Sequence, residues 1–144
     1  MEIFNRPPTA KGPAATFTGD VWVDGIYAGP SRAQARLSAV RFAPCARSHW
    51  HSHRLGQTLH ILDGTALLGS RDGTVIEARP GDTICTAPGE EHWHGAAPGR
   101  FMAHLALMEG DGSDEPRTVW GVAVSDSDYQ AERTPLVNQH KQDS

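Results

Sequence analysis

His49-Trp50-His51-Ser52-His53-Arg54-Leu55-Gly56-Gln57 places two histidines two residues apart and a glutamine shortly after them. On a β-strand, side chains at positions i and i+2 leave the same face, so His51 and His53 are expected to point the same way. Imidazole is the commonest protein ligand of divalent transition metals, and this pair would form half of a metal site. Gln57, which follows a turn containing Gly56, can add an amide oxygen.

A second segment, Pro88-Gly89-Glu90-Glu91-His92, lies well downstream and adds another histidine. His92 follows its own turn residues, so it can close a metal site from a different strand. His94 shares the strand parity of His92, and both are therefore expected to face the same cavity. The alternative is that His51 and His53 are ordinary surface histidines on a polar strand.

The composition is that of a single compact protein. The chain has 144 residues and a formal net charge of −4, and it contains no basic run, which argues against nucleic acid as a partner. No apolar segment is long enough to span a membrane, and the N-terminus lacks the design of a signal peptide. Two cysteines, Cys45 and Cys85, do not make a disulfide framework. We therefore expect a cytoplasmic protein that acts on a small molecule.

Short runs of β-branched and aromatic residues alternate with turns containing Gly, Pro and Asp. They predict strands at residues 16–22, 35–42, 48–53, 57–62, 65–69, 75–78, 83–86, 92–96 and 100–109, and a last strand within 119–124. We expect 57–62 to pair with 48–53, and 26–32 to be a loop because it carries Gly29-Pro30. The pattern is typical of an all-β barrel or sandwich.

The two ends of the chain differ from this middle part. Residues 1–15 are rich in proline and are expected to form a loop-like arm, followed by a single domain at 16–134. A short helix is expected within 126–133, capped by Ser125 or Ser127. Residues 135–144 are polar and predict a flexible tail. Trp50 and Trp93 adjoin the candidate ligands and are expected on the opposite strand faces, where they would brace the ligand strands from outside.

Two strands are expected to line the interior. In 35–42, Ser38 and Val40 share one face, and we predict that they contact the substrate. The segment 101–108 is almost entirely apolar, so both of its faces should be covered. One face carries His104 into the barrel, as a core histidine or a catalytic one. The other face needs a cover, either the N-terminal strand or a second subunit, which predicts a homodimer or a larger homo-oligomer.

The two histidine segments together resemble the two motifs of the cupin superfamily. The first motif is His-x-His, three or four residues, an acidic ligand, six residues and Gly, which this chain matches with His51, His53, Gln57 and Gly64. The second is Gly, five residues, Pro-x-Gly, two residues and His, which this chain matches with Gly81, Gly89 and His92, with Ala87 at the Pro position. The resemblance implies a double-stranded β-helix, a jelly-roll barrel, with a metal held by these side chains.

The chain is most similar in pattern to small single-domain bacterial cupins, from about residue 17 to 129. These include manganese-dependent hydroxynitrile lyases and relatives of carboxymuconolactone-decarboxylase-associated cupins. The resemblance to the lyases implies Mn(II), with Fe, Ni or Zn as other candidates, held by His51, His53, Gln57 and His92. It also implies that His104 handles substrate or cyanide. The chain departs from these relatives at Arg54, often Pro in them, which is placed to bind an anionic substrate.

These residues favour a Lewis-acid lyase. The four predicted ligands are neutral, so a divalent ion keeps its full charge, which suits polarising a substrate oxygen better than redox cycling. In a cyanohydrin lyase, His104 or His94 would take the hydroxyl proton while cyanide leaves.

Three other functions stay open at this stage. A non-haem iron cupin could use dioxygen on a small phenol or diketone, although the neutral Gln57 argues against it. A sugar-acid or tautomerising isomerase could use Arg54 to bind a carboxylate. A cupin that only binds a small ligand would show no metal-dependent turnover.

Overall fold

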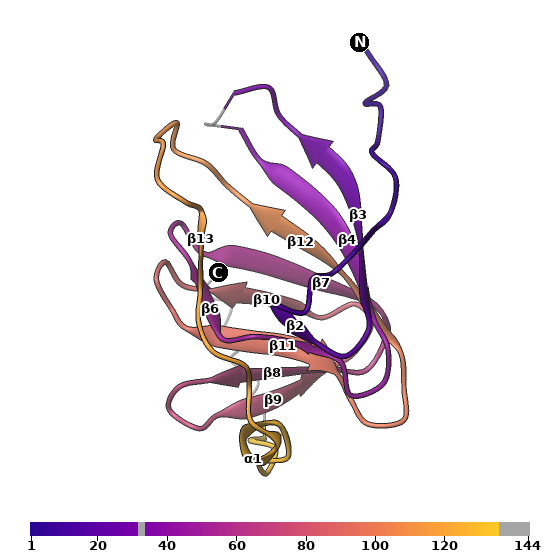
Figure 1. Cartoon of the computed structure of the whole chain (residues 1–144), viewed down its shortest axis with the longest axis vertical. Helices are drawn as coiled ribbons and strands as arrows, with labels where there is room; N and C mark the ends of the chain where they lie inside the picture. The colour runs from indigo at the N-terminus through magenta and orange to yellow at the C-terminus, as the bar shows by residue number, and fades with distance from the viewer. Residues whose placement is uncertain (32–33, 136–144) are drawn as a thin grey trace, which may run out of the picture.

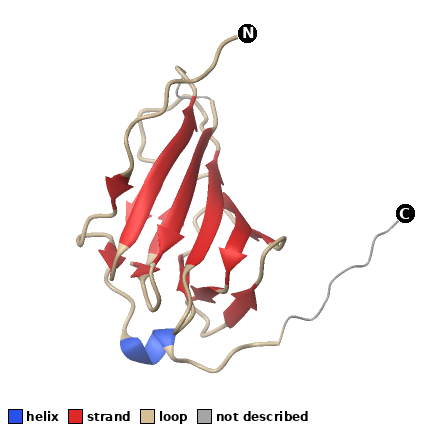
Figure 2. Ribbon diagram, turned by 90° about the vertical axis from the view of Figure 1, so that its right-hand side faces the viewer, coloured by secondary structure: helices blue, strands red, loops and turns tan. Residues whose placement is uncertain are grey.

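The computed structural model describes residues 1–31 and 34–135, and nearly all its regular structure is β. Two curled sheets pack face to face, as Figures 1 and 2 show. One sheet has six strands, in the order β1 (Ala10–Lys11), β3 (Val21–Ala28), β4 (Arg36–Phe42), β12 (Met102–Met108), β7 (Gln57–Gly64) and β10 (Thr83–Thr86). This architecture confirms the all-β class predicted from the strand pattern.

The second sheet has seven strands and carries the histidine segments. Its main path runs β13 (Thr118–Trp120), β6 (His51–His53), β11 (His92–Ala96), β5 (Arg47–Ser48) and β2 (Phe17–Thr18). The hairpin of β8 (Ala66–Ser70) and β9 (Val75–Ala78) joins this sheet by pairing β8 with β11. The strands predicted at 65–69 and 75–78 form this hairpin, and the strand predicted at 83–86 is confirmed.

The interior between the sheets is built by the alternation of side chains along each strand. On β7, Leu59 and Ile61 point inward and are almost fully buried, and on β12 Met102 and Ala106 do the same. Phe42 closes the same apolar cluster from β4. Because strand side chains alternate with period two, the residues between these positions lie on the outer faces.

A second apolar cluster lies outside the barrel, behind the ligand strands. It contains Trp50 and Trp93 together with Leu67, Val75, Val124 and Tyr129. This confirms that the two tryptophans brace the ligand strands from outside. Tyr129 belongs to the only helix among the described residues, α1 (Asp126–Tyr129), which is capped by Ser125 and ends four residues earlier than expected.

The predicted pairing of 57–62 with the ligand strand is wrong. β7 pairs with β10 and β12, whereas β6 pairs with β11 and β13. Between β6 and β7 the chain crosses from one sheet to the other through a turn at Gly56, whose φ is +79°. A Cβ at Gly56 would lie 2.5 Å from the carbonyl oxygen of Thr86, so only glycine fits this crossing.

The N-terminal strands also differ from the prediction. β3 runs on through Asp24-Gly25, past the predicted strand end at residue 22, and continues into the predicted loop as far as Ala28. Gly25 pairs with Ser38 and Tyr27 with Leu37, so Ile26 is the extra residue of a bulge directly after the glycine. The predicted arm contains β1, which pairs with β3.

The ligand strand is interrupted as well. Residues 48–53 form β5 and β6 rather than one strand, because the backbone of Trp50 bonds to Gly121 and Val122 instead of continuing the ladder. Within the described ranges, no helix is long and apolar enough to cross a bilayer. Beyond Pro135, the tail predicted for 135–144 lies outside the described residues.

Candidate metal centre

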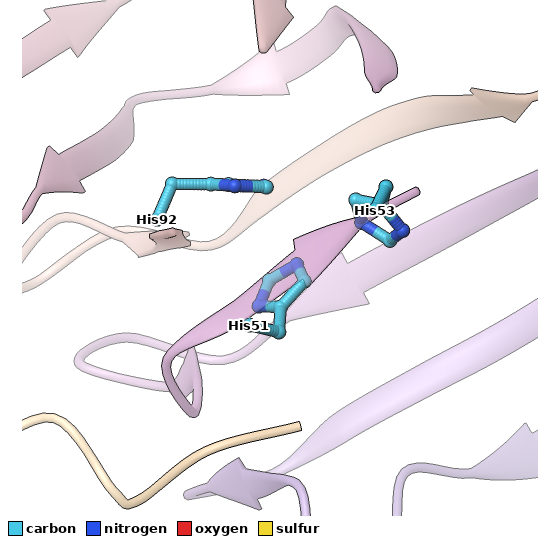
Figure 3. A group of neighbouring side chains, drawn as sticks. All are labelled: His51, His53 and His92. Atoms are coloured by element: carbon cyan, nitrogen blue, oxygen red, sulfur yellow. The ribbon is translucent and has the colours of Figure 1, made fainter. Parts of the chain in front are cut away.

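Three histidines from two neighbouring strands meet inside the barrel. His51 and His53 lie on β6, and His92 lies on β11 directly opposite His51 (Figure 3). One ring nitrogen from each histidine lies within 4.8 Å of those of the other two. His51 and His53 are only 2% and 4% exposed, which excludes the alternative that they are surface histidines. A cluster of this kind can hold a metal ion.

Each of the three rings is oriented by a hydrogen bond at its Nδ1 atom. Nδ1 of His51 donates to the carbonyl oxygen of His49 at 2.8 Å, and Nδ1 of His92 donates to the carbonyl oxygen of Glu90 at 3.0 Å. Nδ1 of His53 lies 3.0 Å from the hydroxyl of Thr118 on β13. With the proton on Nδ1, the lone pair sits on Nε2, the form in which imidazole binds a metal.

The remaining nitrogen atoms fit a metal. Nε2 of His53 is buried and has no hydrogen-bond partner, a costly arrangement that a bound cation relieves. Oε1 of Gln57, which is 7% exposed at the start of β7, lies 3.2 Å from Nε2 of His92. This contact places the amide oxygen of Gln57 beside the ring nitrogens of the cluster. The structure therefore brings the four predicted ligands together.

Burial keeps the clustered histidines neutral. Desolvation, followed by the proximity of His92, lowers the pKa of His51 to about 3 and that of His53 to about 4. Desolvation also lowers the pKa of His92. Metal binding requires unprotonated imidazole, so these side chains are in the ligand form at neutral pH.

A second pair of histidines lies beside the cluster. Nε2 of His104 on β12 is 2.9 Å from Nδ1 of His94 on β11, and both side chains are buried. The ring of His94 contacts those of His51 and His92, with centroids 5.1 and 5.8 Å apart, and the rings of both His94 and His104 pack on Phe42. His94 therefore lies between His104 and the metal cluster. Burial lowers the pKa of His104 to about 4 and that of His94 well below its usual value.

The predicted substrate contacts from β4 flank this histidine pair. On β4, Val40 lies directly opposite His104 of β12, and Ser38 lies directly opposite Ala106 of β12. Val40 is buried in the apolar cluster, and Ser38 is partly exposed.

Arg54 lies at the rim of the barrel rather than inside it. Its guanidinium donates to the carboxylate of Asp111 and to the hydroxyl of Ser113. Both side chains of the Arg54–Asp111 ion pair are more than a third exposed. The pair holds Arg54 in place at the surface, close to His53. His60 lies on the outer face of β7, where its Nδ1 atom is bonded to the hydroxyl of Thr83.

Two neighbours of the cluster were not singled out from the sequence. Thr118 orients His53, and Trp120 packs on His51 with ring centroids 4.7 Å apart. Both lie on β13, which pairs with β6. The position of Trp120 beside His51 depends on that pairing, for which a strand pattern carries no signal.

Comparison with known proteins shows the family to which this chain belongs. A model of the cupin domain matches residues 38–107. A protein named (R)-mandelonitrile lyase, from Granulicella tundricola, is 42% identical over 121 residues, which cover 84% of this chain and 91% of that protein. The chain belongs to the cupin family.

Solved cupin structures share the architecture. A cupin-like protein from Thermotoga maritima is 31% identical, with a TM-score of 0.77 over 90% of this chain and 95% of that one. A polyketide cyclase from Streptomyces resistomycificus is 20% identical, with a TM-score of 0.67 over 90% of both chains, and shows the fold alone. The histidines of the two cupin motifs recognised in the sequence, His51, His53 and His92, thus lie together in one buried cluster.

Proposed function

We propose that this cupin is a metal-dependent lyase that cleaves and forms cyanohydrins of small aldehydes. The proposal is supported by the 42% identity to a protein named (R)-mandelonitrile lyase and by the three-histidine cluster. The residues that would hold the ion are His51, His53, Gln57 and His92. Manganese(II) is the ion we propose, as in the lyases that the sequence resembles.

A divalent ion bound there supplies Lewis-acid stabilisation of a substrate oxygen. The four side chains around it bring no negative charge, so this electrostatic stabilisation is not weakened by the ligands. Their burial also excludes water, which strengthens every electrostatic interaction in the site.

The histidine pair handles the proton. In cyanohydrin cleavage, His94 accepts the hydroxyl proton, the carbon–cyanide bond breaks with its electron pair leaving on cyanide, and the carbonyl forms. The same imidazolium then returns the proton to cyanide, so that aldehyde and hydrogen cyanide are released. His104 holds the ring of His94 through the contact at 2.9 Å. A positioned imidazole base typically contributes a factor of about 10²–10⁴.

One observation carries this assignment. A neutral histidine pair adjoins a three-histidine cluster in the same interior, with the His94 and His51 rings 5.1 Å apart. A base and an electrophilic ion within reach of one small molecule are what proton removal from a polarised hydroxyl requires.

The direct test is cyanide release from mandelonitrile by manganese-loaded protein, compared with metal-free protein. We expect release only from the loaded sample, and about one metal ion per chain by elemental analysis. A loaded protein that releases no cyanide overturns the proposal.

The double change His51→Ala, His53→Ala tests the ligands independently of turnover. We expect the bound metal to be lost, because two of the four proposed donors are removed. Full retention of metal would show that the ligands are misassigned. Oxygen consumption by an iron-loaded sample would instead indicate a dioxygenase.

A further inference from the structure

The two sheets leave a seam on one side of the barrel. In the part of the chain that the structure describes, β9 pairs with β8 and β10 pairs with β7, but β9 and β10 do not pair with each other. A cavity of about 190 Å³ lies at this seam. It is partly open, so a small molecule can enter between the two strand edges.

The walls of this seam cavity are apolar and belong to the barrel interior. Leu68, Ile76 and Ile84 line it, one each from β8, β9 and β10. Leu68 is a core residue, and the two isoleucines pack against the same core while staying partly exposed. An inward-facing isoleucine that is incompletely buried leaves apolar surface for a ligand to cover.

The inner end of the cavity reaches the proposed active site. His92 lines it. Leu68 lies directly opposite His94 on one side and Ile76 on the other, so one wall continues into the histidine pair. A molecule whose reacting carbon lies beside His92 and His94 can therefore place its side chain between the two strand edges.

Three polar side chains of the rim are bonded within the protein. The Ser70 hydroxyl donates to Asp72, and the Thr86 hydroxyl accepts from the backbone nitrogen of Gln57. The carboxylate of Glu90 accepts from the backbone nitrogen of Ala87. These bonds hold polar rim groups in place, while the three apolar walls favour an apolar occupant.

We propose that the seam cavity binds the aromatic side chain of the aldehyde or cyanohydrin, an inference that rests on the function proposed above. Its volume suits a single ring, since an apolar cavity of about 150 Å³ is large enough to bind benzene. Ile84 and Ile76 then set the size of side chain that the enzyme accepts, and small aliphatic substrates leave the cavity unfilled.

The test is a substitution that enlarges one side chain of the cavity wall, so that it fills part of the cavity. Ile84→Phe is compared with Thr83→Phe, a change on the same strand but on the opposite, exposed face. We expect Ile84→Phe to lower kcat/KM for mandelonitrile at least about tenfold while changing that for lactonitrile less than about twofold. Thr83→Phe should leave the ratio of the two substrates unchanged. An equal loss for both substrates, or no loss, overturns the proposal.

Two further measurements keep the test decisive. Ile84→Ala enlarges the cavity and should raise kcat/KM for a naphthaldehyde cyanohydrin relative to mandelonitrile. An unchanged ratio would contradict the proposal even if Ile84→Phe does not fold.

Benzaldehyde binding, measured by NMR titration of the manganese-free protein without cyanide, tests the cavity when no lyase activity exists. We expect Ile84→Phe, and not Thr83→Phe, to abolish that binding. Binding without turnover would overturn the proposed function and leave the aromatic site standing.

Discussion

Gln57 is the proposed ligand that carries an uncharged amide oxygen. Its Oε1 atom faces Nε2 of His92 at 3.2 Å. Gln57→Glu adds a negative charge beside the ion, so we expect manganese to bind at least about tenfold more tightly, a change of about 1.4 kcal/mol. Cyanide release should fall, because the added charge weakens the Lewis acidity of the ion.

Chelator competition measures the affinity, and Gln34→Glu, at an exposed position remote from the cluster, is the matched control. A Gln57→Glu protein with unchanged affinity and unchanged turnover would place Gln57 outside the ligand set.

His94 and His104 are expected to differ in their response to the same substitution. Glutamine keeps a hydrogen bond and much of the volume but cannot accept a proton at neutral pH. We expect His94→Gln to lower kcat by about 10²–10⁴, and His104→Gln to lower it by no more than about tenfold, the equivalent of one weakened hydrogen bond.

His104→Ala provides the contrast, since it removes the contact to His94 altogether. It should lower kcat further than His104→Gln and destabilise the protein by about 1–3 kcal/mol, with metal content intact. If His104→Gln were as inactive as His94→Gln, His104 would be a proton acceptor in its own right.

Among the elements, the short helix α1 braces the strand that carries His92 and His94. The hydroxyl of Tyr129 donates to the carbonyl oxygen of Ala96 at the end of β11, at 2.6 Å. Arg47 packs over the Tyr129 ring, with the guanidinium carbon 4.5 Å from the ring centre, and donates to the carbonyl oxygen of Val124. Burial raises the pKa of Tyr129 to about 12, so the hydroxyl stays a donor.

Tyr129→Phe leaves the buried carbonyl oxygen of Ala96 without this partner. We expect the free energy of unfolding to fall by about 1–3 kcal/mol in urea denaturation. Tyr27→Phe is the control, because Tyr27 is 39% exposed and its change should stay within about 0.5 kcal/mol. Equal stability of the two variants would show that the contact does not brace the barrel.

For the whole molecule, the outer face of the six-stranded sheet is the feature that calls for a partner. Leu105 lies opposite Ala39 and Leu107 lies opposite Leu37, forming an apolar stripe on that face. The N-terminal arm contacts this sheet at Asp24 on β3, where the hydroxyl of Thr9 donates to its carboxylate, and Leu107 on β12 is 37% exposed. We propose that a second copy of the chain covers it, because a self-complementary apolar face is typical of two-fold homodimers.

Light scattering at micromolar concentration should give the mass of a dimer or a larger oligomer. Leu105→Arg places a charge in the middle of the stripe and should give monomers, whereas Val122→Arg, 69% exposed elsewhere on the surface, should not. A monomer mass for the unmodified protein would remove the argument.

Much of this protein could be predicted from local sequence. Strand positions follow from alternation and turn residues, which act over a few neighbours, so 75–78, 83–86 and 92–96 were predicted residue for residue. The ligand candidates followed because histidines at i and i+2 share a face in any strand. Their spacing to Gln57 and His92 matched a known pair of motifs, and the family followed from the same residues.

Tertiary structure alone decided which strands meet. The pattern of 57–62 is equally compatible with either sheet, and the crossing at Gly56 depends on how closely the backbone of Thr86 approaches. The position of His94 between His104 and the metal cluster likewise depends on how the strands are arranged. β11 carries His94 and β12 carries His104, and the two strands belong to different sheets. Hydrogen bonds between strands join residues far apart in the chain, and side-chain periodicity records which face a residue occupies but not which strand lies beside it.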